Sequence, residues 1–230
     1  MISLRDLELD EGDYPLEALS LRVAGGEIYF LLNRPEQAND RLFRLLAGYV
    51  RPLRGEIQFD GRPPAIAGRG VPALFIDRVV DPVEFETEAR LGDWLDFLCA
   101  GGGLDRRRVY ETLLLCNFHD RHLRSRVRDL PPEVFKQIYL AVCLAPGHGN
   151  IVCNDFIRGA AKGFELKFNK LLLQEKARGR AVLCLGYDIF YASEIADRVG
   201  FVKNGRLLLE IGASDLKEMD IKDLYGRFLT

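Results

Sequence analysis

The chain has 230 residues, enough to bury a core as one domain and to carry an inserted subdomain. Its formal net charge of -2 excludes a general preference for nucleic acids or anionic membranes, so partners have to be inferred from particular sites. The five cysteines include no C-x-x-C pair, which indicates buried thiols in a reducing cytoplasm rather than disulfides or zinc. No apolar run approaches the length that spans a bilayer, and the acidic N-terminal segment predicts a strand rather than a signal peptide. We therefore expect a soluble globular protein.

Short β-type runs dominate the first third of the chain, with a turn predicted at Gly25-Gly26. Apolar residues at helical spacing predict a helix over 40–47, and Gly48 predicts its end. The strands expected in this part span 2–9, 19–23, 28–32, 56–59 and 71–76.

The apolar period becomes helical between about residues 84 and 145, where charged residues fill the gaps. An Asn204-Gly205 turn predicts a hairpin near the end of the chain, and a short amphipathic segment follows it. This order of elements predicts an α/β layered domain with a helical insert. The later elements are strands over 151–153, 181–185, 199–202 and 206–211, and a helix over 164–176.

Four segments carry a resemblance to a known family: ALSLRVAGGEIYFLL, RLFRLLAGYVRPLRGEIQFDGRP, LAVCLAPGHGNIVCND and IADRVGFVKNGRLLL. Their order and spacing resemble the nucleotide-binding subunit of ATP-binding cassette (ABC) transporters over essentially the whole chain. The resemblance implies a P-loop NTPase-like ABC cassette, an α/β fold with a mixed β core, an antiparallel β subdomain and a helical subdomain. It implies a single domain over 1–230, with the helical subdomain inserted at 84–145.

The loop NRPEQAND stands where the family carries its phosphate-binding loop, G-x-x-x-x-G-K-[ST]. Asn33 and Ala38 correspond to the two glycines, and Asn39 and Asp40 correspond to the lysine and the Ser/Thr. Without the glycines the backbone wraps an anion less easily, and without the lysine the phosphate charge is not compensated. Glu36 and Asp40 add carboxylates that repel phosphate. The alternative interpretation is a plain strand-to-helix connection in which Asn39 or Asp40 caps the helix.

Four further positions differ from the family pattern. Asn154 corresponds to an Asp that orders Mg²⁺, and Asp155 to a Glu that polarises the attacking water, one methylene longer. Tyr187 corresponds to the histidine that contacts the γ-phosphate, and Asp77 to the glutamine that senses Mg²⁺. The alternative for Asn154 and Asp155 is a polar strand end whose groups bond to neighbouring backbone.

The family's signature turn LSGGQ, which grips nucleotide held by the partner subunit, corresponds here to LPPEV. Two prolines remove N–H donors from this turn, and a glutamate adds a repelling carboxylate. The corresponding residues are Leu130, Pro131, Pro132, Glu133 and Val134.

Phe85, Trp94 and Phe97 lie where family members receive a coupling helix from a membrane subunit. Trp94 and Phe97 are three residues apart, so a helix places them on one face. They predict a partner-docking surface, and the alternative is that they belong to the core of the helical subdomain.

The replacements together predict a degenerate member of the family that lacks the Walker A, signature, Walker B and H-loop residues. We expect a pseudo-ATPase rather than an enzyme, with no ATP or Mg²⁺ as cofactor. Its expected role is the structural or regulatory half of an ABC transporter at the inner face of the cytoplasmic membrane. The expected partners are a transmembrane subunit and a second cassette, either an active paralogue or a second copy.

Two alternatives stay open. One is a divergent ATP-hydrolysing subunit of a heterodimer, with ATP and Mg²⁺ as cofactors and Asp155 as the base. The other is an adaptor that uses the ABC fold outside transport. Nucleic acid is not expected as a partner, because the arginines of the helical segment alternate with acidic residues.

Overall fold

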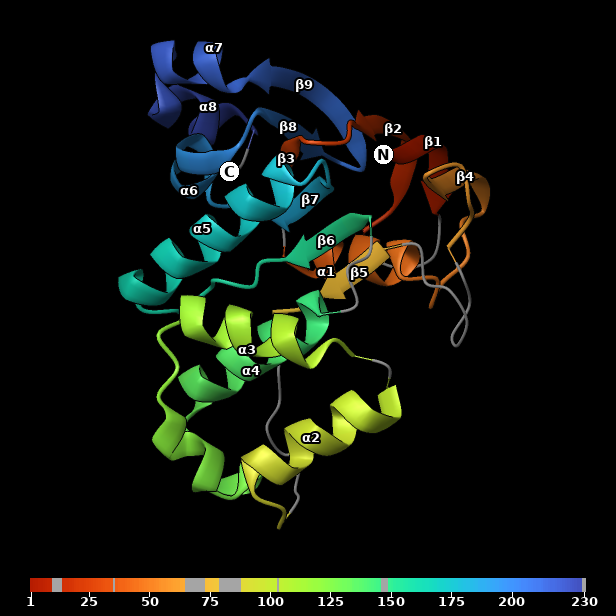
Figure 1. The fold of residues 1–230 in the computed structure, drawn as a ribbon. Helices are drawn as coiled ribbons and strands as arrows, with labels where there is room; N and C mark the ends of the chain where they lie inside the picture. Colours follow the sequence, from red (N-terminus) through yellow and green to blue (C-terminus); the bar gives the residue numbers. More distant parts are fainter. Residues whose placement is uncertain are drawn as a thin grey trace. The chain divides into compact units, whose positions relative to one another are not determined.

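The computed structural model describes residues 1–9, 14–34, 36–64, 73–78, 88–102, 104–145 and 149–228. The chain forms two compact units (Figure 1). The first unit contains residues 1–75, 148–155 and 172–230, and the second contains residues 76–147 and 156–171. No helix within the described ranges is both long and apolar enough to cross a bilayer.

A three-stranded antiparallel sheet with the order β2-β1-β4 lies in the first unit. Its strands are β1 (Ile2–Leu9), β2 (Leu16–Val23) and β4 (Arg54–Phe59). The buried positions of β2 recur largely at every second residue, as expected when one face packs on the core and the other meets solvent. Two of these strands begin earlier than predicted, at Leu16 and Arg54.

The second sheet of this unit has six strands in the order β5-β6-β7-β3-β8-β9. Strands β6, β7, β3 and β8 are mutually parallel neighbours, and β9 pairs with β8 in the predicted hairpin. Every residue of β3, β6 and β7 is buried, which is typical of parallel strands covered on both faces. The bounds are β5 (Ala73–Ile76), β6 (Asn150–Asn154), β7 (Ala181–Gly186), β3 (Ile28–Asn33), β8 (Arg198–Lys203) and β9 (Arg206–Gly212).

The helix after β3 differs from the prediction. It was expected from residue 40, but α1 spans Glu36–Leu46 and begins almost directly after the strand. Acidic and polar side chains suit the first turn because they favour the positive end of the helix dipole. The other helices whose residues lie in this unit are the C-terminal part of α5 (Lys162–Ala177), α6 (Ile189–Ile195), α7 (Ala213–Glu218) and α8 (Ile221–Phe228).

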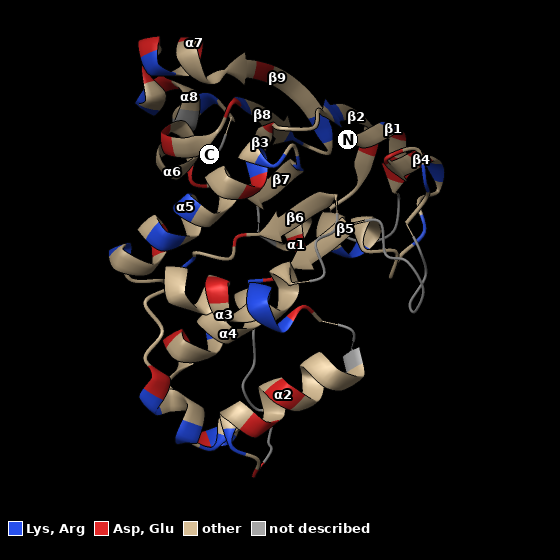
Figure 2. Ribbon diagram, viewed as in Figure 1, with Lys and Arg blue, Asp and Glu red and all other residues tan. Residues whose placement is uncertain are grey.

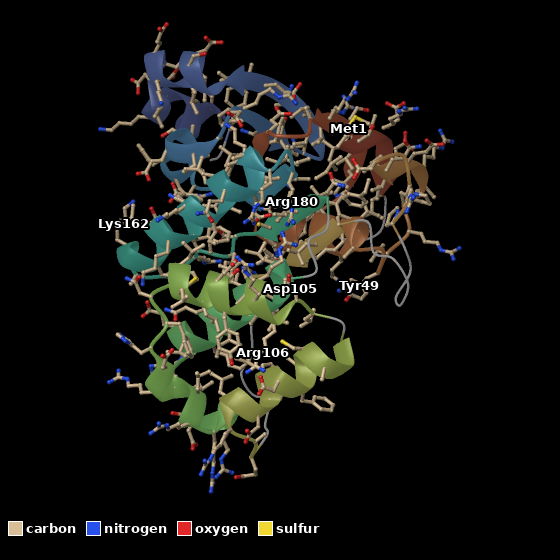
Figure 3. The ribbon with its side chains drawn as sticks, in the orientation of Figure 1. Met1, Tyr49, Asp105, Arg106, Lys162 and Arg180 are labelled. Atoms are coloured by element: carbon tan, nitrogen blue, oxygen red, sulfur yellow. The ribbon has the colours of Figure 1, made fainter. Side chains whose placement is uncertain are left out.

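The second unit is mostly helical and has its own apolar core. Its helices include α2 (Leu91–Gly102), α3 (Arg106–Leu115) and α4 (Pro132–Leu144). Asp105, labelled in Figure 3, caps α3 by accepting hydrogen bonds from the backbone N–H groups of Arg107 and Arg108. Leu95, Val109 and Phe135 are among the residues that fill the core between these helices.

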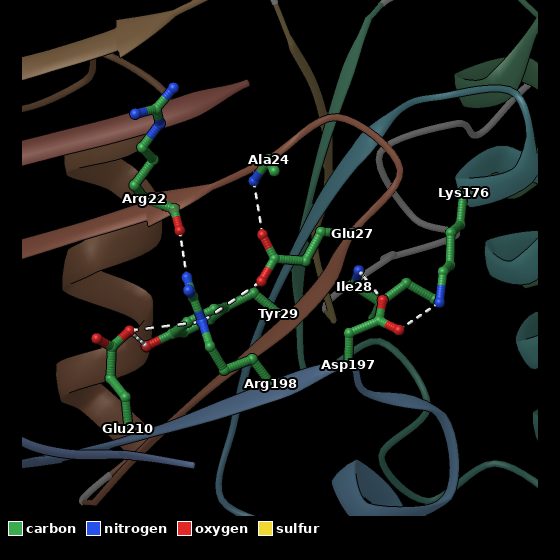
Figure 4. Close-up of polar contacts among 9 residues, drawn as sticks. All are labelled: Arg22, Ala24, Glu27, Ile28, Tyr29, Lys176, Asp197, Arg198 and Glu210. Atoms are coloured by element: carbon green, nitrogen blue, oxygen red, sulfur yellow. Dashed lines mark hydrogen bonds and ion pairs between the residues drawn. The ribbon is translucent and has the colours of Figure 1, made fainter. Parts of the chain in front are cut away.

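The buried Tyr29 lies in a polar cluster that also contains the residue linking the two sheets of the first unit (Figure 4). The Tyr29 hydroxyl donates to Glu210 Oε1 at 2.6 Å, and the guanidinium of Arg198 lies 4.8 Å from the centre of the ring. Burial and the bond to Glu210 raise the pKa of Tyr29 far above its ordinary value, so the phenol stays neutral. Arg198 also donates to the backbone carbonyl of Arg22 on β2, which links the edge of one sheet to the other.

Candidate functional site

The parallel strands of the larger sheet end together in a cluster of polar side chains. Because the carboxyl ends of parallel strands share one edge, residues far apart in the sequence meet there. The cluster is formed by the ends of β3, β6 and β7 and the start of α1. Its members are Asn33, Arg34, Ala38, Asn39, Asp40, Asn154, Asp155, Gly186 and Tyr187.

Asn39 lies at the centre of this cluster and is 2% exposed. Its side-chain Nδ2 donates to the backbone oxygens of Asn33 and Gly186, each at 3.2 Å. One amide group therefore connects the ends of β3 and β7 to helix α1. Its Oδ1 is buried and accepts no hydrogen bond from the described residues.

Asp40 and Asn154 are also paired. Asn154 Nδ2 donates to Asp40 Oδ1 at 2.9 Å, and Asn154 is almost fully buried. In the pattern implied by the resemblance, the carboxylate would belong to β6 and the neutral oxygen ligand to the helix. Here the carboxylate comes from the helix and the neutral group from the strand.

Asp155 directly follows β6 and has a left-handed backbone conformation, with φ at 44°. This region is uncommon for residues other than glycine, although aspartate adopts it more readily than most. The backbone N–H of Asp155 donates to the carbonyl of Leu185 at 2.9 Å. Its Oδ1 would lie 3.8 Å from a Cβ added at Gly186, so this carboxylate lies beside the end of β7.

Arg34 is the functional candidate that the sequence analysis missed. It is exposed directly after β3, and its guanidinium carbon lies 5.2 Å from the ring centre of Tyr187. Such stacking holds a cation near the ends of β3 and β7. Its position as the basic residue immediately after a buried strand was the available signal.

Ala38 and Glu36 complete the predicted phosphate loop. Ala38 is buried, and Glu36 is the first residue of α1, although its side chain lies outside what the structure describes. Only Arg34 and Pro35 separate β3 from α1. The described residues therefore form a short strand-to-helix connection.

We tested whether the cluster fits a magnesium–triphosphate group, which the resemblance implies. Asp40 and Asp155 contribute carboxylates to the cluster. Arg34 contributes a cation, but it lies at the start of the loop, whereas the family's lysine lies at the end of the loop. Within the described ranges, no three His, Cys, Asp or Glu side chains gather so as to hold a metal. The buried Asn39 oxygen would repel a phosphate oxygen rather than bind it. The arrangement thus does not fit the family's lysine-based cradle, and we derive no hydrolytic step from it.

The remaining predicted nucleotide-site residues belong to the second unit. The backbone N–H of Asp77 donates to the Tyr139 hydroxyl at 3.5 Å, and Asp77 Oδ1 accepts from the N–H of Arg78 at 2.7 Å. The segment Leu130 to Val134 forms the start of α4: Leu130 is buried, Pro131 is the N-cap, and Pro132 is the first helical residue. Proline is favoured at that position, and Glu133 in the first turn complements the helix dipole. Val134 packs against the core of the unit.

The predicted docking residues differ in exposure. Trp94 is partly buried against the core of the second unit, whereas Phe97 on the same helix is 72% exposed. Phe85 lies outside the described residues. The structure therefore gives Trp94 a packing role and leaves the Phe97 ring open to solvent.

Comparisons with solved structures identify the fold. One chain described as the ATP-binding subunit of an ABC transporter matches with a TM-score of 0.83 at 17% identity, over 100% of both chains. CbiO1 from Clostridium perfringens, part of the transporter complex CbiONQ, matches with a TM-score of 0.76 at 19% identity, over 98% and 94% of the two chains. The chain has the ABC ATPase cassette fold.

Proteins similar in sequence to this chain include import proteins. The ribose import ATP-binding protein RbsA 1 of Mesorhizobium japonicum is 22% identical over 91% of this chain and 42% of its own length. The phosphonates import ATP-binding protein PhnC of Hydrogenovibrio crunogenus is 22% identical over 94% of this chain and 84% of its own length. No family model matches the cassette. The relatives are thus similar to this chain in sequence over most of its length, and the structural neighbours share its fold.

These relatives correct one prediction. We predicted that the cassette is not an enzyme, because Asn39, Asn154 and Tyr187 depart from the family pattern. The relatives are named ATP-binding import proteins, which contradicts that prediction. Replacements at single positions do not exclude an enzyme in a chain that is similar over most of its length to proteins named for ATP binding. The cassette spans less than half the length of the ribose-import relatives that it matches.

Proposed function

We propose that this cassette is a subunit of an ATP-dependent ABC import complex. In this complex it binds a transmembrane subunit and a second cassette at the inner face of the cytoplasmic membrane. The observation that carries the proposal is the sequence similarity to relatives named for import, and the cassette fold over the full chain agrees with it.

Helix α2 offers the docking surface of the proposal. Phe97 is 72% exposed, and Trp94 one turn earlier fixes the helix against the core of its unit. Burying an exposed phenylalanine ring in a partner contributes about 1.5–3 kcal/mol to binding. A rigid helix that presents an aromatic ring is therefore suited to a groove or helix of a membrane subunit.

ATP turnover is proposed as a property of the assembled complex, in line with the names of the relatives. Asp155 is the carboxylate at the end of β6, where the resemblance places the residue that polarises water. Because the cluster of this chain does not fit a lysine-based phosphate cradle, substitution of Asp155 tests whether this chain takes part in turnover of the complex at all.

The test is co-expression with a membrane subunit encoded beside the gene, followed by purification in detergent. We expect the two chains to purify together, and Phe97→Ser to reduce the recovered cassette several-fold. Leu114→Ser is the matched control, because Leu114 is 68% exposed on α3 of the same unit. Failure to recover a complex, or equal losses with both variants, would contradict the docking proposal.

Measurement of ATP hydrolysis by the purified complex tests the proposal that the complex is ATP-dependent. We expect measurable hydrolysis, and we expect Asp155→Asn to reduce it at least tenfold if this chain supplies the base. Unchanged turnover in Asp155→Asn would reject Asp155 as the base. An assembled complex without turnover would reject the ATP-dependent function.

A further inference from the structure

The helical unit carries a group of arginines that the proposed function does not use. They lie on the segment before α2 and on two 3-10 helices, Asp120–Arg124 and Val127–Asp129. Figure 2 shows basic residues interspersed with acidic ones at the lower end of this unit, beside α2. We call this group the arginine tip, and its members, all exposed, are Arg90, Arg121, Arg124, Arg126 and Arg128.

Backbone hydrogen bonds hold the two segments of the arginine tip together. The N–H of Leu91 donates to the carbonyl of Ser125 at 2.9 Å, and the N–H of Val127 donates to the carbonyl of Ala89 at 3.1 Å. Arg90 and Arg126 thus form an antiparallel bridge. A Cβ added at Gly92 would lie 3.3 Å from the carbonyl of Leu123, so the start of α2 also approaches the first 3-10 helix closely.

Apolar side chains of the same segments attach the arginine tip to the core of the unit. Val127 and Leu130 are buried in the core of the unit, and Leu123 packs against that core. The arginines between them consequently project from a fixed backbone. A preorganised group of charges loses less conformational entropy on binding than the same charges on a mobile loop.

The tip already holds one carboxylate. Arg126 Nη1 lies 2.9 Å from Glu88 Oε2, and Arg128 bonds to the other oxygen of the same group. Two guanidinium groups therefore share one glutamate, each beside one of its two oxygens, so the tip binds a carboxylate through charge-assisted contacts.

Among the described residues of the tip there are five arginines and three acidic residues, Glu88, Asp120 and Asp129. Among the described residues, Arg90, Arg121 and Arg124 form no ion pair with a carboxylate, whereas Arg128 also approaches Asp129 Oδ1 at 3.5 Å. Burial lowers the pKa of His122, and the charge of Arg121 lowers it further, as a cationic neighbourhood does.

We propose that the arginine tip binds an acidic segment of a partner protein, whose carboxylates pair with the open arginines and exchange with Glu88. The acidic residues Glu88, Asp120 and Asp129 stand between the arginines. The phosphates of a nucleic acid or the headgroups of an anionic membrane would be repelled by these carboxylates. A short acidic peptide can avoid this repulsion, because its own carboxylates can lie between those of the tip. The proposal goes beyond the transport function and holds whether or not the partner is the membrane subunit.

Fluorescence anisotropy of the full chain with a labelled glutamate-rich decapeptide tests the proposal. We expect binding at 50 mM NaCl that weakens steeply at 300 mM. The double variant Arg121→Gln/Arg124→Gln should weaken binding roughly fivefold to tenfold, as expected for two exposed charge pairs. Glu88→Gln should tighten binding about threefold, because it removes the internal competitor.

The matched control removes two arginines from α3 of the same unit. Arg106 and Arg107 already pair with Asp96 and Glu111, so Arg106→Gln/Arg107→Gln should leave peptide binding within twofold of the parent. An equal loss in both double variants would show general charge attraction and overturn the proposal. Weaker binding by Glu88→Gln, or tighter binding of vesicles containing phosphatidylglycerol or of duplex DNA than of the peptide, would also overturn it.

Discussion

The side-chain amide of Asn39 shows how one residue can hold several elements together. It is buried, and its Nδ2 donates to a carbonyl at the end of β3 and to another at the end of β7. When buried carbonyl groups lose their hydrogen-bond donor, the free energy of unfolding falls by about 1–3 kcal/mol. The position that the family resemblance assigns to a lysine therefore has a structural role in this chain.

Asn39→Leu keeps the number and branching of the side-chain heavy atoms and removes both donated hydrogen bonds. We expect the free energy of unfolding to fall by about 2 kcal/mol, measured by urea denaturation followed by circular dichroism. Gln37→Ala is the control, because Gln37 is exposed on the same helix and should change stability by less than about 0.5 kcal/mol. A variant at Asn39 as stable as the parent would show that the two bonds contribute little.

Gly200 is constrained by a side chain from the neighbouring strand. A Cβ added there would collide with the Tyr29 hydroxyl and would lie 3.0 Å from Leu207 Cδ1. We expect Gly200→Ala to lower the free energy of unfolding by about 1–3 kcal/mol through overpacking.

A double variant separates this collision from other effects of alanine. Tyr29→Phe removes the hydroxyl and with it the hydrogen bond to Glu210, so alone it should destabilise the protein by about 1 kcal/mol. In the Gly200→Ala background it should restore part of the lost stability, and thermal unfolding of the four proteins measures this coupling. Purely additive losses would contradict the collision.

At the scale of elements, the turn between α5 and β7 contains a buried ion pair. Glu175 is 3% exposed, and its Oε2 lies 2.5 Å from Nη1 of Arg180, which is labelled in Figure 3. Arg178 also bonds to Glu175, but it is half exposed. Removing one partner of a buried pair leaves a buried charge uncompensated.

Glu175→Gln should therefore lower the free energy of unfolding by about 3 kcal/mol in guanidinium denaturation. Arg178→Gln removes the exposed partner of the same carboxylate and should cost less than about 1 kcal/mol. The pair Glu175→Leu/Arg180→Met should recover much of the loss, since apolar side chains remove both buried charges. Similar losses for Glu175→Gln and Arg178→Gln would argue against burial as the cause.

The sequence predicted the strands that consist of apolar residues and the turn that has a characteristic residue pair. The apolar runs at 151–153 and 181–185 lie in β6 and β7, and the Asn204-Gly205 turn joins β8 to β9. The sequence predicts the start of α1 four residues too late. The first turn contains Ala38 and Asn39, which are buried although they do not continue the apolar spacing of the helix.

The sequence brought several of the candidate residues to one edge of the sheet but did not show how their side chains pair. Parallel strands and the resemblance placed Asn33, Asn154 and Tyr187 at one edge of the sheet. The Asp40–Asn154 bond and the stacking of Arg34 on Tyr187 depend on strand register and side-chain rotamers. Those features arise from tertiary packing, which a linear pattern does not contain.

At the scale of the whole molecule, neither compact unit is one continuous stretch of chain. The chain passes from one unit to the other after residues 75, 147, 155 and 171, and helix α5 contributes residues to both. The second unit consists of two chain segments whose ends continue into the first unit. If the first unit unfolded, the ends of these two segments would no longer be held in place. We therefore infer that the two units unfold together.

Trp94 makes this inference testable, because it is the sole tryptophan of the sequence and lies in the second unit. Glu175 lies in the first unit, so Glu175→Gln perturbs that unit directly. We expect this variant to lower the guanidinium midpoint of Trp94 fluorescence by the same amount as the midpoint of circular dichroism at 222 nm, as in a two-state transition. A fluorescence midpoint that stays at its parent value while the dichroism midpoint falls would show that the helical unit unfolds independently.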